Sequence, residues 1–171
     1  MLEIRKARPE DAEAIARIHA DSWREAYSGI VPEELLRTRY SFGPRLKMWR
    51  KFLSEDAGGH FVCEADGKPV GFFSLCAPRD RDMPGDALEL AAIYFSPGCR
   101  GKGYGSEAMR FIVREAQRRG CRKLCLWVLR QNAAVIRFYE KSGFRYGGLT
   151  RVLELGGPVP ECRYERELKD L

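Results

Sequence analysis

A glycine-rich turn in the middle of the chain is the stretch whose residue types most directly predict chemistry. It is the run Arg100-Gly101-Lys102-Gly103-Tyr104-Gly105, which follows an apolar segment and leads into a helical pattern near Ser106. Glycines carry no side chain that would keep a ligand off the backbone, so consecutive N–H groups and the first helical amides can converge on one anion. Arg100 and Lys102 add two full positive charges. The turn therefore predicts a binding site for a phosphate or pyrophosphate group.

The spacing of these glycines excludes two common phosphate-binding motifs. A mononucleotide P-loop requires Ser or Thr after Gly-Lys, but Gly103 follows Lys102. A dinucleotide fingerprint requires an acidic residue about 20 positions further on, where this chain has the run from Trp127 to Arg130. The pattern that remains, Arg-x-x-Gly-x-Gly, resembles the acetyl-coenzyme A signature of the GNAT family of N-acetyltransferases.

A second block of sequence carries the same resemblance. Residues 132–144, Asn-Ala-Ala-Val-Ile-Arg-Phe-Tyr-Glu-Lys-Ser-Gly-Phe, are similar to the family's Asn…Tyr-Glu-Lys-x-Gly-Phe segment. The two blocks stand in the family's order and at a similar separation. The likeness is best from about Leu88 to Gly147, whereas the first 85 residues match only loosely, mainly through residues 8–12 and 22–27.

The resemblance implies a fold and a way of holding the co-substrate. The fold is α/β (α+β), a mixed and mostly antiparallel sheet of about seven strands with helices on both faces and acetyl-CoA wedged between the fourth and fifth strands. The backbone of Ile93, Tyr94 and Phe95 would pair with the pantetheine arm as a substitute strand. Residues Arg100 to Ser106 would hold the pyrophosphate. Asn132 would bond to the same arm, or it serves only as a helix N-cap.

The resemblance also implies acetyl transfer by direct attack of an amine on the thioester. A lysine-like amine has a pKa of about 10.4, so a group must accept its proton. Glu89 stands where some family members carry a general base, although a carboxylate paired with an arginine is the plainer interpretation. Tyr139 matches the tyrosine that protonates the departing thiolate, or it is a packed aromatic residue. Trp127 occupies the position where peptide α-amine acetylases carry a glutamate.

The acceptor is predicted from the aromatic residues of the amino-terminal helices. Trp23 and Tyr27 are the candidate substrate contacts, with Tyr40 near them, although a core position is the plainer interpretation for each. A small-molecule amine, such as a polyamine, an amino acid or an antibiotic, is favoured over a protein amino group. A non-catalytic module that binds coenzyme A, and a nucleic-acid binder suggested by charge alone, are the alternatives.

Composition narrows the class of protein. The chain has 171 residues, enough for a single domain over residues 1–171, and a net charge of +6. Its basic cluster lacks the interleaved aromatic residues that stack on bases, so we interpret it as a solvated helix end and expect no nucleic-acid partner. Six cysteines without a Cys-x-x-Cys pair, and two histidines, predict free thiols and no metal. The cluster comprises Arg114, Arg118, Arg119, Arg122 and Lys123.

The amino terminus lacks an apolar run, so we expect no export signal and no membrane span, and a cytoplasmic location. The sequence leaves the choice between a monomer and a homodimer open. Hydrophobic periodicity predicts strands at residues 2–7, 60–65, 69–77, 87–95, 123–129, 144–155 and 161–168, and helices at 9–27, 32–40, 44–53, 103–119 and 132–141. Residues 56–59 are expected as a loop, residues 66–68 as a hairpin turn and residues 78–86 as a mobile connection.

Overall fold

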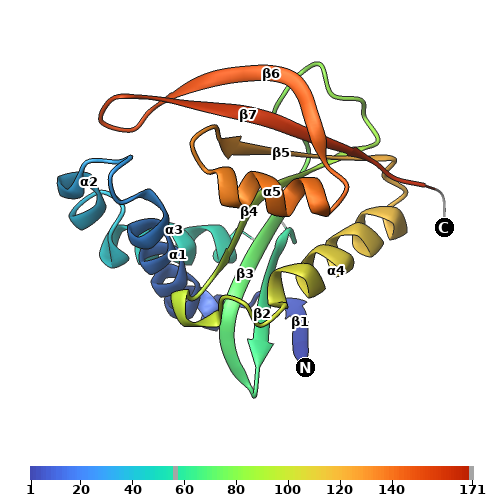
Figure 1. Cartoon of the computed structure of the whole chain (residues 1–171). Coiled ribbons are helices and arrows are strands. Elements are labelled where there is room, and N and C mark those ends of the chain that lie inside the picture. The colour runs from blue at the N-terminus through green and yellow to red at the C-terminus, as the bar shows by residue number, and fades with distance from the viewer. Residues whose placement is uncertain (56–57, 170–171) are drawn as a thin grey trace. The chain divides into compact units, whose positions relative to one another are not determined.

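The computed structural model of the chain describes residues 1–55 and 58–169. Seven strands form one mixed sheet in the order β1-β2-β3-β4-β5-β7-β6, with β4 and β5 parallel (Figure 1). The other described strand pairings, from β1–β2 to β6–β7, are antiparallel. This confirms the predicted mixed sheet of about seven strands. The chain divides into two compact units, residues 1–74 with 92–107 and residues 75–91 with 108–171, and the expectation of a single domain stays a prediction.

The first unit contains β1, the three amino-terminal helices and the β2–β3 hairpin. Its elements lie within three residues of their predicted bounds, and the predicted loop at residues 56–59 falls partly on residues 56–57, which lie outside the described residues. The bounds are β1 (Leu2–Lys6), a 3₁₀ turn (Pro9–Asp11), α1 (Ala12–Tyr27), α2 (Glu33–Arg37), α3 (Phe42–Ser54), β2 (His60–Ala65) and β3 (Lys68–Cys76). It also contains the end of β4 (Ala87–Phe95) and the start of α4 (Tyr104–Arg118).

The core of the first unit lies where α1 packs against α3, which run side by side in Figure 1. Ile15 and Ala16 of α1 meet Trp49 of α3 there, together with Phe72 of β3. Burying such side chains stabilises the unit by roughly 1.5 to 3 kcal/mol each. Phe52, which the helical pattern predicts in this core, is 38% exposed, so that prediction is wrong. Its ring instead stacks on His60 at the edge of the core, 6.1 Å between centroids.

Two close backbone arrangements shape the β2–β3–β4 region of this unit. The hairpin turn has Asp66 at φ 51° and Gly67 at φ 70°, the pair of positive angles that a two-residue turn between right-twisted strands requires. At Gly71 a Cβ atom would lie 2.3 Å from a ring carbon of Phe95, so only glycine leaves room for that ring against β3. The N–H of Ser96 donates to the carbonyl of Val70 at 2.8 Å, fixing the end of β4 beside β3.

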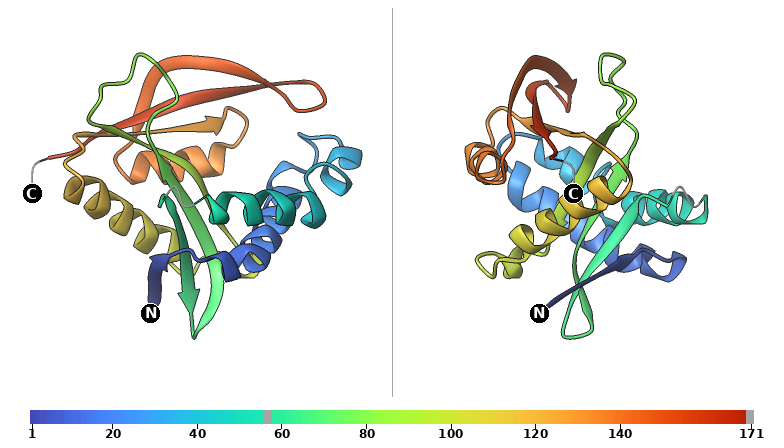
Figure 2. Two further views of the ribbon diagram at one scale, coloured as in Figure 1. Left: turned by 180° about the vertical axis from the view of Figure 1, so that it is seen from behind. Right: turned by 90° about the vertical axis from the view of Figure 1, so that its right-hand side faces the viewer.

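The second unit is built on β5 (Lys123–Leu129), α5 (Ala133–Lys141), β6 (Arg145–Glu154) and β7 (Pro158–Glu167). Strands β6 and β7 form the long hairpin seen from two further sides in Figure 2. β7 begins three residues earlier than residue 161, the predicted start. Proline is accepted as the first residue of a strand because its missing N–H breaks no ladder bond, so Pro158 does not delay the strand. The parallel ladder in this unit pairs Ala87, Leu88 and Glu89 with residues 123–125.

Candidate functional site

The glycine turn has the backbone geometry that the sequence predicts. Gly101 and Gly103 lie at φ 74° and 80°, in the left-handed region that residues with a side chain adopt only with strain. A Cβ atom added at either position would meet nothing within 4 Å. Glycine is therefore required here by the backbone angle and not by packing, and α4 begins directly after the turn, at Tyr104.

The amides of this turn are the groups that can bind an anion. In the described part of the chain, the N–H groups of residues 101–106 have no hydrogen-bond acceptor in the protein, and the next one, on Glu107, donates to the carbonyl of Gly103 at 3.1 Å. Arg100 and Lys102 are exposed beside them, with Arg100 paired to Glu25 at 3.2 Å. Six unpaired donors at the positive end of a helix, next to two cations, suit a diphosphate.

The end of β4 is held by hydrogen bonds from α1. The hydroxyl of Ser22 donates to the carbonyl of Phe95 at 3.0 Å, and the hydroxyls of Tyr27 and Tyr94 lie 3.3 Å apart. The Tyr94 ring stacks on His19, with 5.2 Å between centroids and 26° between planes. The stretch from Ile93 to Phe95 is thus a fixed edge next to the aromatic residues of the helices.

Those aromatic residues form one cluster, as the sequence predicts for Trp23, Tyr27 and Tyr40. The Trp23 ring lies 4.6 Å from the Tyr27 ring, nearly perpendicular to it, and 4.9 Å from the Tyr40 ring. All three are partly exposed, so they combine packing with access to solvent. The cluster can contact an acceptor, and its role in binding one stays a prediction.

His19 lies under this cluster and serves packing. It is 7% exposed, and its Nδ1 accepts a hydrogen bond from the indole Nε1 of Trp49 at 3.0 Å. Burial lowers the pKa of His19 well below 6.5, with the neighbouring charge of Arg45 acting in the same direction. His19 is therefore a neutral imidazole whose Nδ1 is an acceptor.

Arg45 is the residue of this unit that the sequence analysis did not single out. It is 8% exposed, although arginine is seldom buried without a partner. Among the described residues, neither its Nε nor its Nη2 has a hydrogen-bond partner, and the same holds for the buried Nε1 of Trp23. A helical repeat could have identified it, because Arg45 falls on the line Phe42, Arg45, Trp49, Leu53 that faces the core.

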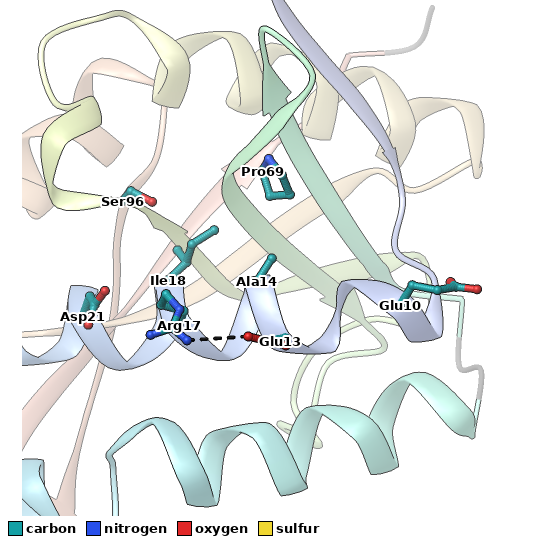
Figure 3. A pocket seen from close by; sticks show the side chains of 8 residues that line it. All are labelled: Glu10, Glu13, Ala14, Arg17, Ile18, Asp21, Pro69 and Ser96. Atoms are coloured by element: carbon teal, nitrogen blue, oxygen red, sulfur yellow. Dashed lines mark ion pairs between the residues drawn. The ribbon is translucent and has the colours of Figure 1, made fainter.

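A cavity of about 440 Å³ lies along α1, and its charge makes it a poor phosphate site. Figure 3 shows its lining residues. Three of these are the carboxylates Glu10, Glu13 and Asp21, against the single cation Arg17, which pairs with Glu13 at 3.6 Å. The excess negative charge would repel the phosphates of a coenzyme. The cavity therefore differs in kind from the glycine turn.

In the second unit, Glu89 is buried and ion-paired. It is 1% exposed, and its Oε2 accepts the backbone N–H of Arg79 at 3.0 Å. Its Oε1 accepts hydrogen bonds from the Nε of Arg79, at 3.1 Å, and from Nη2. This hydrogen bonding raises the pKa of Arg79. The ion pair that the sequence left open for Glu89 is thus present, and a role as general base would have to operate from within it.

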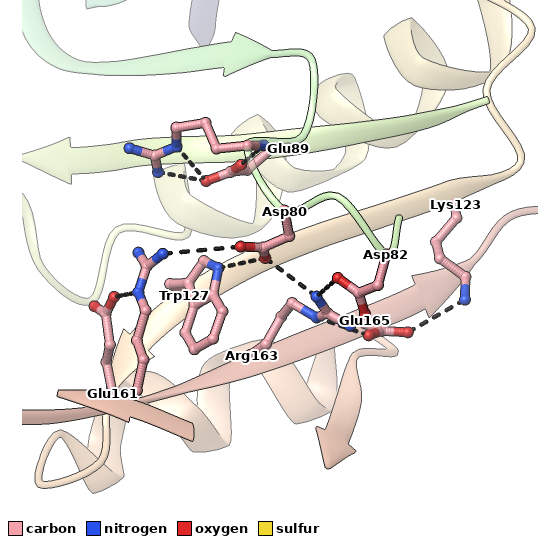
Figure 4. A network of polar contacts seen from close by, with 10 residues as sticks. Asp80, Asp82, Glu89, Lys123, Trp127, Glu161, Arg163 and Glu165 are labelled. Atoms are coloured by element: carbon pink, nitrogen blue, oxygen red, sulfur yellow. Dashed lines mark hydrogen bonds and ion pairs between the residues drawn. The ribbon is translucent and has the colours of Figure 1, made fainter. Parts of the chain in front are cut away.

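A network of ion pairs holds the connection at residues 78–86, which the sequence predicts to be mobile (Figure 4). Arg163, 4% exposed, binds Asp80 at 3.1 Å and both oxygens of Asp82, at 2.6 and 2.7 Å. The indole N–H of Trp127 donates to Asp80 at 2.9 Å. Arg163 is buried, so its charge would be costly to leave without these partners, and the contacts argue for an anchored connection.

Tyr139 and Asn132 lie on and before α5. Tyr139 is 7% exposed, with its ring 5.5 Å from that of Phe138 and 5.9 Å from that of Phe144. The side chain of Asn132 accepts the N–H of Val135 at 3.4 Å, so it is the helix N-cap. The capping function is therefore present for Asn132, and the predicted coenzyme contact stays a prediction.

Neither a metal-ligating group nor a membrane-spanning helix is present among the described residues. All six cysteines are free thiols. Within the described ranges, no three His, Cys, Asp or Glu side chains are grouped so that they could hold a metal ion. No helix in those ranges is both long and apolar enough to cross a bilayer.

Comparison with known proteins identifies the family. Residues 13–144 match the acetyltransferase (GNAT) family. An uncharacterised N-acetyltransferase of Methanocaldococcus jannaschii is 34% identical over 104 residues, which cover 57% of this chain and 46% of that protein. A spermidine N(1)-acetyltransferase of Thermoplasma acidophilum is 27% identical over 151 residues, covering 84% of this chain and 88% of that one.

A solved structure extends the likeness to the whole fold. The PaiA N-acetyltransferase of Thermoplasma acidophilum, crystallised with coenzyme A, has a TM-score of 0.74 at 24% identity, covering 98% of this chain and 99% of that one. The chain belongs to the acetyltransferase (GNAT) family. Its class, an acetyl-CoA-dependent acetyltransferase, and its co-substrate are thereby confirmed.

Proposed function

We propose that this protein acetylates a primary amine of a small molecule by direct attack of that amine on the thioester of acetyl-CoA. The observation that carries the proposal is the run of N–H groups at residues 101–106 without protein acceptors. The first amides of any helix lack a partner within the helix, and here the amides of the preceding turn lack one as well, so both sets are free to bind one anion. The amides are therefore suited to an anion from outside the chain.

In this proposal, the first unit binds the pyrophosphate and the pantetheine arm. The amides of residues 101–106 and the side chains of Arg100 and Lys102 hold the pyrophosphate, and Arg100 exchanges its exposed partner Glu25 for it. The backbone of Ile93, Tyr94 and Phe95 receives the arm as an added strand. The Ser22 hydroxyl anchors the Phe95 carbonyl and so keeps this edge in place. Acetyl-CoA supplies an acetyl group activated as a thioester.

In the second unit, Tyr139 is proposed to donate a proton to the thiolate and Asn132 to hydrogen-bond to the arm. The Asn132 side chain uses its oxygen for Val135, which leaves its amide hydrogens to donate elsewhere. Because a thiol has a pKa of about 8.5, its proton transfer should matter less than orientation. Replacing Tyr139 with Phe is therefore expected to lower kcat by about tenfold and not to abolish it.

Glu89 remains the proposed acceptor of the amine proton, and its ion pair with Arg79 defines the test. If Glu89 acts as the base, Glu89→Gln should lower kcat/KM by more than about tenfold, most strongly at low pH, because 10²-fold or more is typical of a general base. Arg79→Gln, which removes the same ion pair but keeps the carboxylate, should retain most of the activity. Equal losses in the two variants, with an unchanged pH profile, would show that the pair serves structure only.

A screen for released coenzyme A tests the function itself. The protein is incubated with acetyl-CoA and a panel of polyamines, amino acids, aminoglycosides and an amino-terminal peptide, and coenzyme A is measured by chromatography. The proposal expects turnover with at least one small amine above the rate of hydrolysis. Turnover with the peptide alone would replace the small-molecule acceptor with a protein amino group, and binding of acetyl-CoA without any turnover would indicate a non-catalytic module.

A further inference from the structure

Arg45 in the first turns of α3 presents a charged hydrogen-bonding edge that the protein itself does not use. Its side chain is more than nine-tenths buried, and its Nε and Nη2 have no partner among the described residues. The adjacent indole Nε1 of Trp23 is a third buried donor without a partner in the described part of the chain. Native proteins satisfy nearly all buried polar groups, so such a group of donors calls for an explanation.

Two other arginines of this chain show what the same edge binds when it has a partner. Arg5 donates from Nε and Nη2 to Glu64 at 3.1 and 2.5 Å, and Arg118 donates from the same two atoms to Glu115 at 2.8 and 2.9 Å. The planar guanidinium offers two parallel N–H groups that match the two oxygens or one oxygen of a carboxylate. In Arg45 this edge has the same chemistry without a protein carboxylate.

Among the described residues, Arg45 contacts aromatic rings and has no ion pair with a carboxylate. Its guanidinium carbon lies 4.5 Å from the Trp23 ring centroid and 5.2 Å from that of Tyr40. Ring faces attract a cation but accept no strong in-plane hydrogen bond, so they leave the donors unsatisfied. Burial lowers the pKa of Arg45, yet arginine keeps its proton in proteins. A buried and permanent positive charge is compensated best by an anion.

The unpartnered donors of Arg45 and Trp23 lie near β4, the strand on which the proposed reaction depends. Trp23 contacts Tyr27, whose hydroxyl lies 3.3 Å from that of Tyr94 on β4. Tyr94 is the middle residue of the segment proposed to receive the coenzyme arm. Tyr40, whose ring also lies over the guanidinium, is partly exposed, as Trp23 is. A ligand reaching Arg45 would therefore lie against β4 on the side of the first two helices.

We propose that the Arg45 guanidinium and the Trp23 indole N–H bind a carboxylate of the acceptor, so that the substrate is an amino acid or a related amino carboxylate. This inference rests on the proposed acetyl transfer to a small amine and narrows its substrate class. A polyamine has no anionic group, and its positive charges would be repelled by Arg45. The aromatic rings around the pair would contact the carbon skeleton of the amino acid.

Matched acceptors that differ only in the carboxylate test the proposal. Each L-amino acid of a panel is compared with the amine formed by its decarboxylation, for example methionine with 3-(methylthio)propylamine and phenylalanine with phenethylamine. We expect kcat/KM for the preferred amino acid to exceed that for its amine by at least about tenfold, because the amine lacks the carboxylate that would pair with Arg45. Amines that equal or exceed their amino acids throughout the panel, with coenzyme A released, would overturn the inference while leaving the proposed function intact.

Two variants locate that preference at Arg45 and Trp23. Arg45→Met should lower kcat/KM about tenfold or more for the amino acid and leave it nearly unchanged for the amine. Trp23→Phe keeps an aromatic ring but removes the indole N–H together with part of the ring area, so it should cause a smaller loss that is greater for the amino acid than for the amine. Equal losses for both acceptors in either variant would mean that the residue supports packing and does not bind the carboxylate.

A binding measurement on the unmodified chain does not depend on these variants folding. The melting temperature of the wild-type protein is measured with the amino acid and with its decarboxylated amine at equal concentration. A ligand at 100 times its Kd stabilises the folded state appreciably, so the amino acid should raise the melting temperature and the amine should not. The opposite order would refute the proposal, and a failure of acetyl-CoA itself to bind would refute the proposed function instead.

Discussion

Glu115 shows at the scale of single residues how this chain uses its many arginines. The carboxylate is nearly buried on α4 and lies 2.8 Å from the Nε of Arg118 and 2.8 Å from the Nε of Arg119. The hydrogen bond from Arg118 is the largest cause that lowers the pKa of Glu115, from 4.5 to about 2, and the hydrogen bond from Arg119 acts in the same direction. Part of the basic cluster that the sequence analysis interpreted as a solvated helix end is therefore engaged in an ion-pair group.

The lowered pKa of Glu115 predicts a pH-dependent stability. Because the folded-state pKa is below the ordinary value, the contribution is complete above about pH 4.5 and is lost as the pH falls toward 2. Glu115→Gln should lower the free energy of unfolding by on the order of 1 kcal/mol at pH 6, since Arg118 is well exposed and its charge is screened. Urea unfolding at pH 6 and pH 3 measures the difference between the variant and the wild-type protein.

That difference should shrink at pH 3, where Glu115 is protonated in the unfolded chain but still largely ionised in the folded protein. Glu3→Gln, at an exposed position of β1, is the matched control and should change stability little at either pH. If Glu115→Gln lowers the free energy of unfolding by the same amount at both pH values, the lowered pKa of Glu115 does not stabilise the folded protein.

Individual residues differ in how far the sequence could predict them. The positive φ angles of Gly101 and Gly103 follow from a turn that no other residue type adopts easily, so the geometry of the turn was predictable. Glu89 could be placed on β4, but its partner could not be found, because Arg79 is one of many arginines and the choice depends on the path of the connection. Arg45 was predictable only in part, since periodicity gives its buried face but not the lack of a partner.

At the scale of elements, β3 and β4 are joined by a contact that only glycine permits. The Phe95 ring occupies the space over Gly71, where a Cβ atom would lie 2.3 Å from it. Gly71→Ala should therefore displace Phe95 and lower the free energy of unfolding by about 1 to 3 kcal/mol, the usual cost of overpacking. Chemical denaturation of the purified variant measures it.

Gly43→Ala is the matched control for Gly71→Ala. Gly43 lies in α3, where an added Cβ atom meets nothing within 4 Å, so alanine should stabilise the helix by up to about 1 kcal/mol. Because Phe95→Leu leaves more room, it should recover part of the Gly71→Ala loss in the double variant. If alanine changes the free energy of unfolding similarly at positions 71 and 43, contact with the Phe95 ring does not determine the effect of Gly71→Ala.

Most elements could be predicted from the sequence because their signals are local. Strands β4 and β5 have the predicted bounds, since an apolar run between a glycine or proline segment and a turn defines each one. The start of β7 was misplaced because a proline normally argues against a strand, although it is tolerated at the first position. The anchoring of residues 78–86 could not be predicted, because it depends on Arg163, about 80 residues further along the chain.

At the scale of the whole molecule, the family membership and the positive net charge both agree with the binding of acetyl-CoA. The chain has a net charge of +6, and cations stand beside the amides that are proposed to bind a diphosphate. The first unit contains the candidate groups for holding coenzyme A and the acceptor, and the second contains Glu89, Asn132 and Tyr139. The family fixes the reaction class, whereas the acceptor contacts proposed here lie on the amino-terminal helices.

Calorimetric titration with acetyl-CoA of two glycine variants tests the central claim most directly. Gly101 and Gly120 lie at the two ends of α4 with nearly equal φ, 74° and 75°, and an added Cβ atom meets nothing at either position. Alanine should therefore cost each variant about the same stability, roughly 1 to 2 kcal/mol. The account predicts a micromolar Kd for the wild-type protein and Gly120→Ala, and a Kd at least about tenfold higher for Gly101→Ala, because hydrogen bonds to a charged group contribute about 1.5 to 3 kcal/mol. Equal affinity in both variants, or no binding by the wild-type protein, would contradict it.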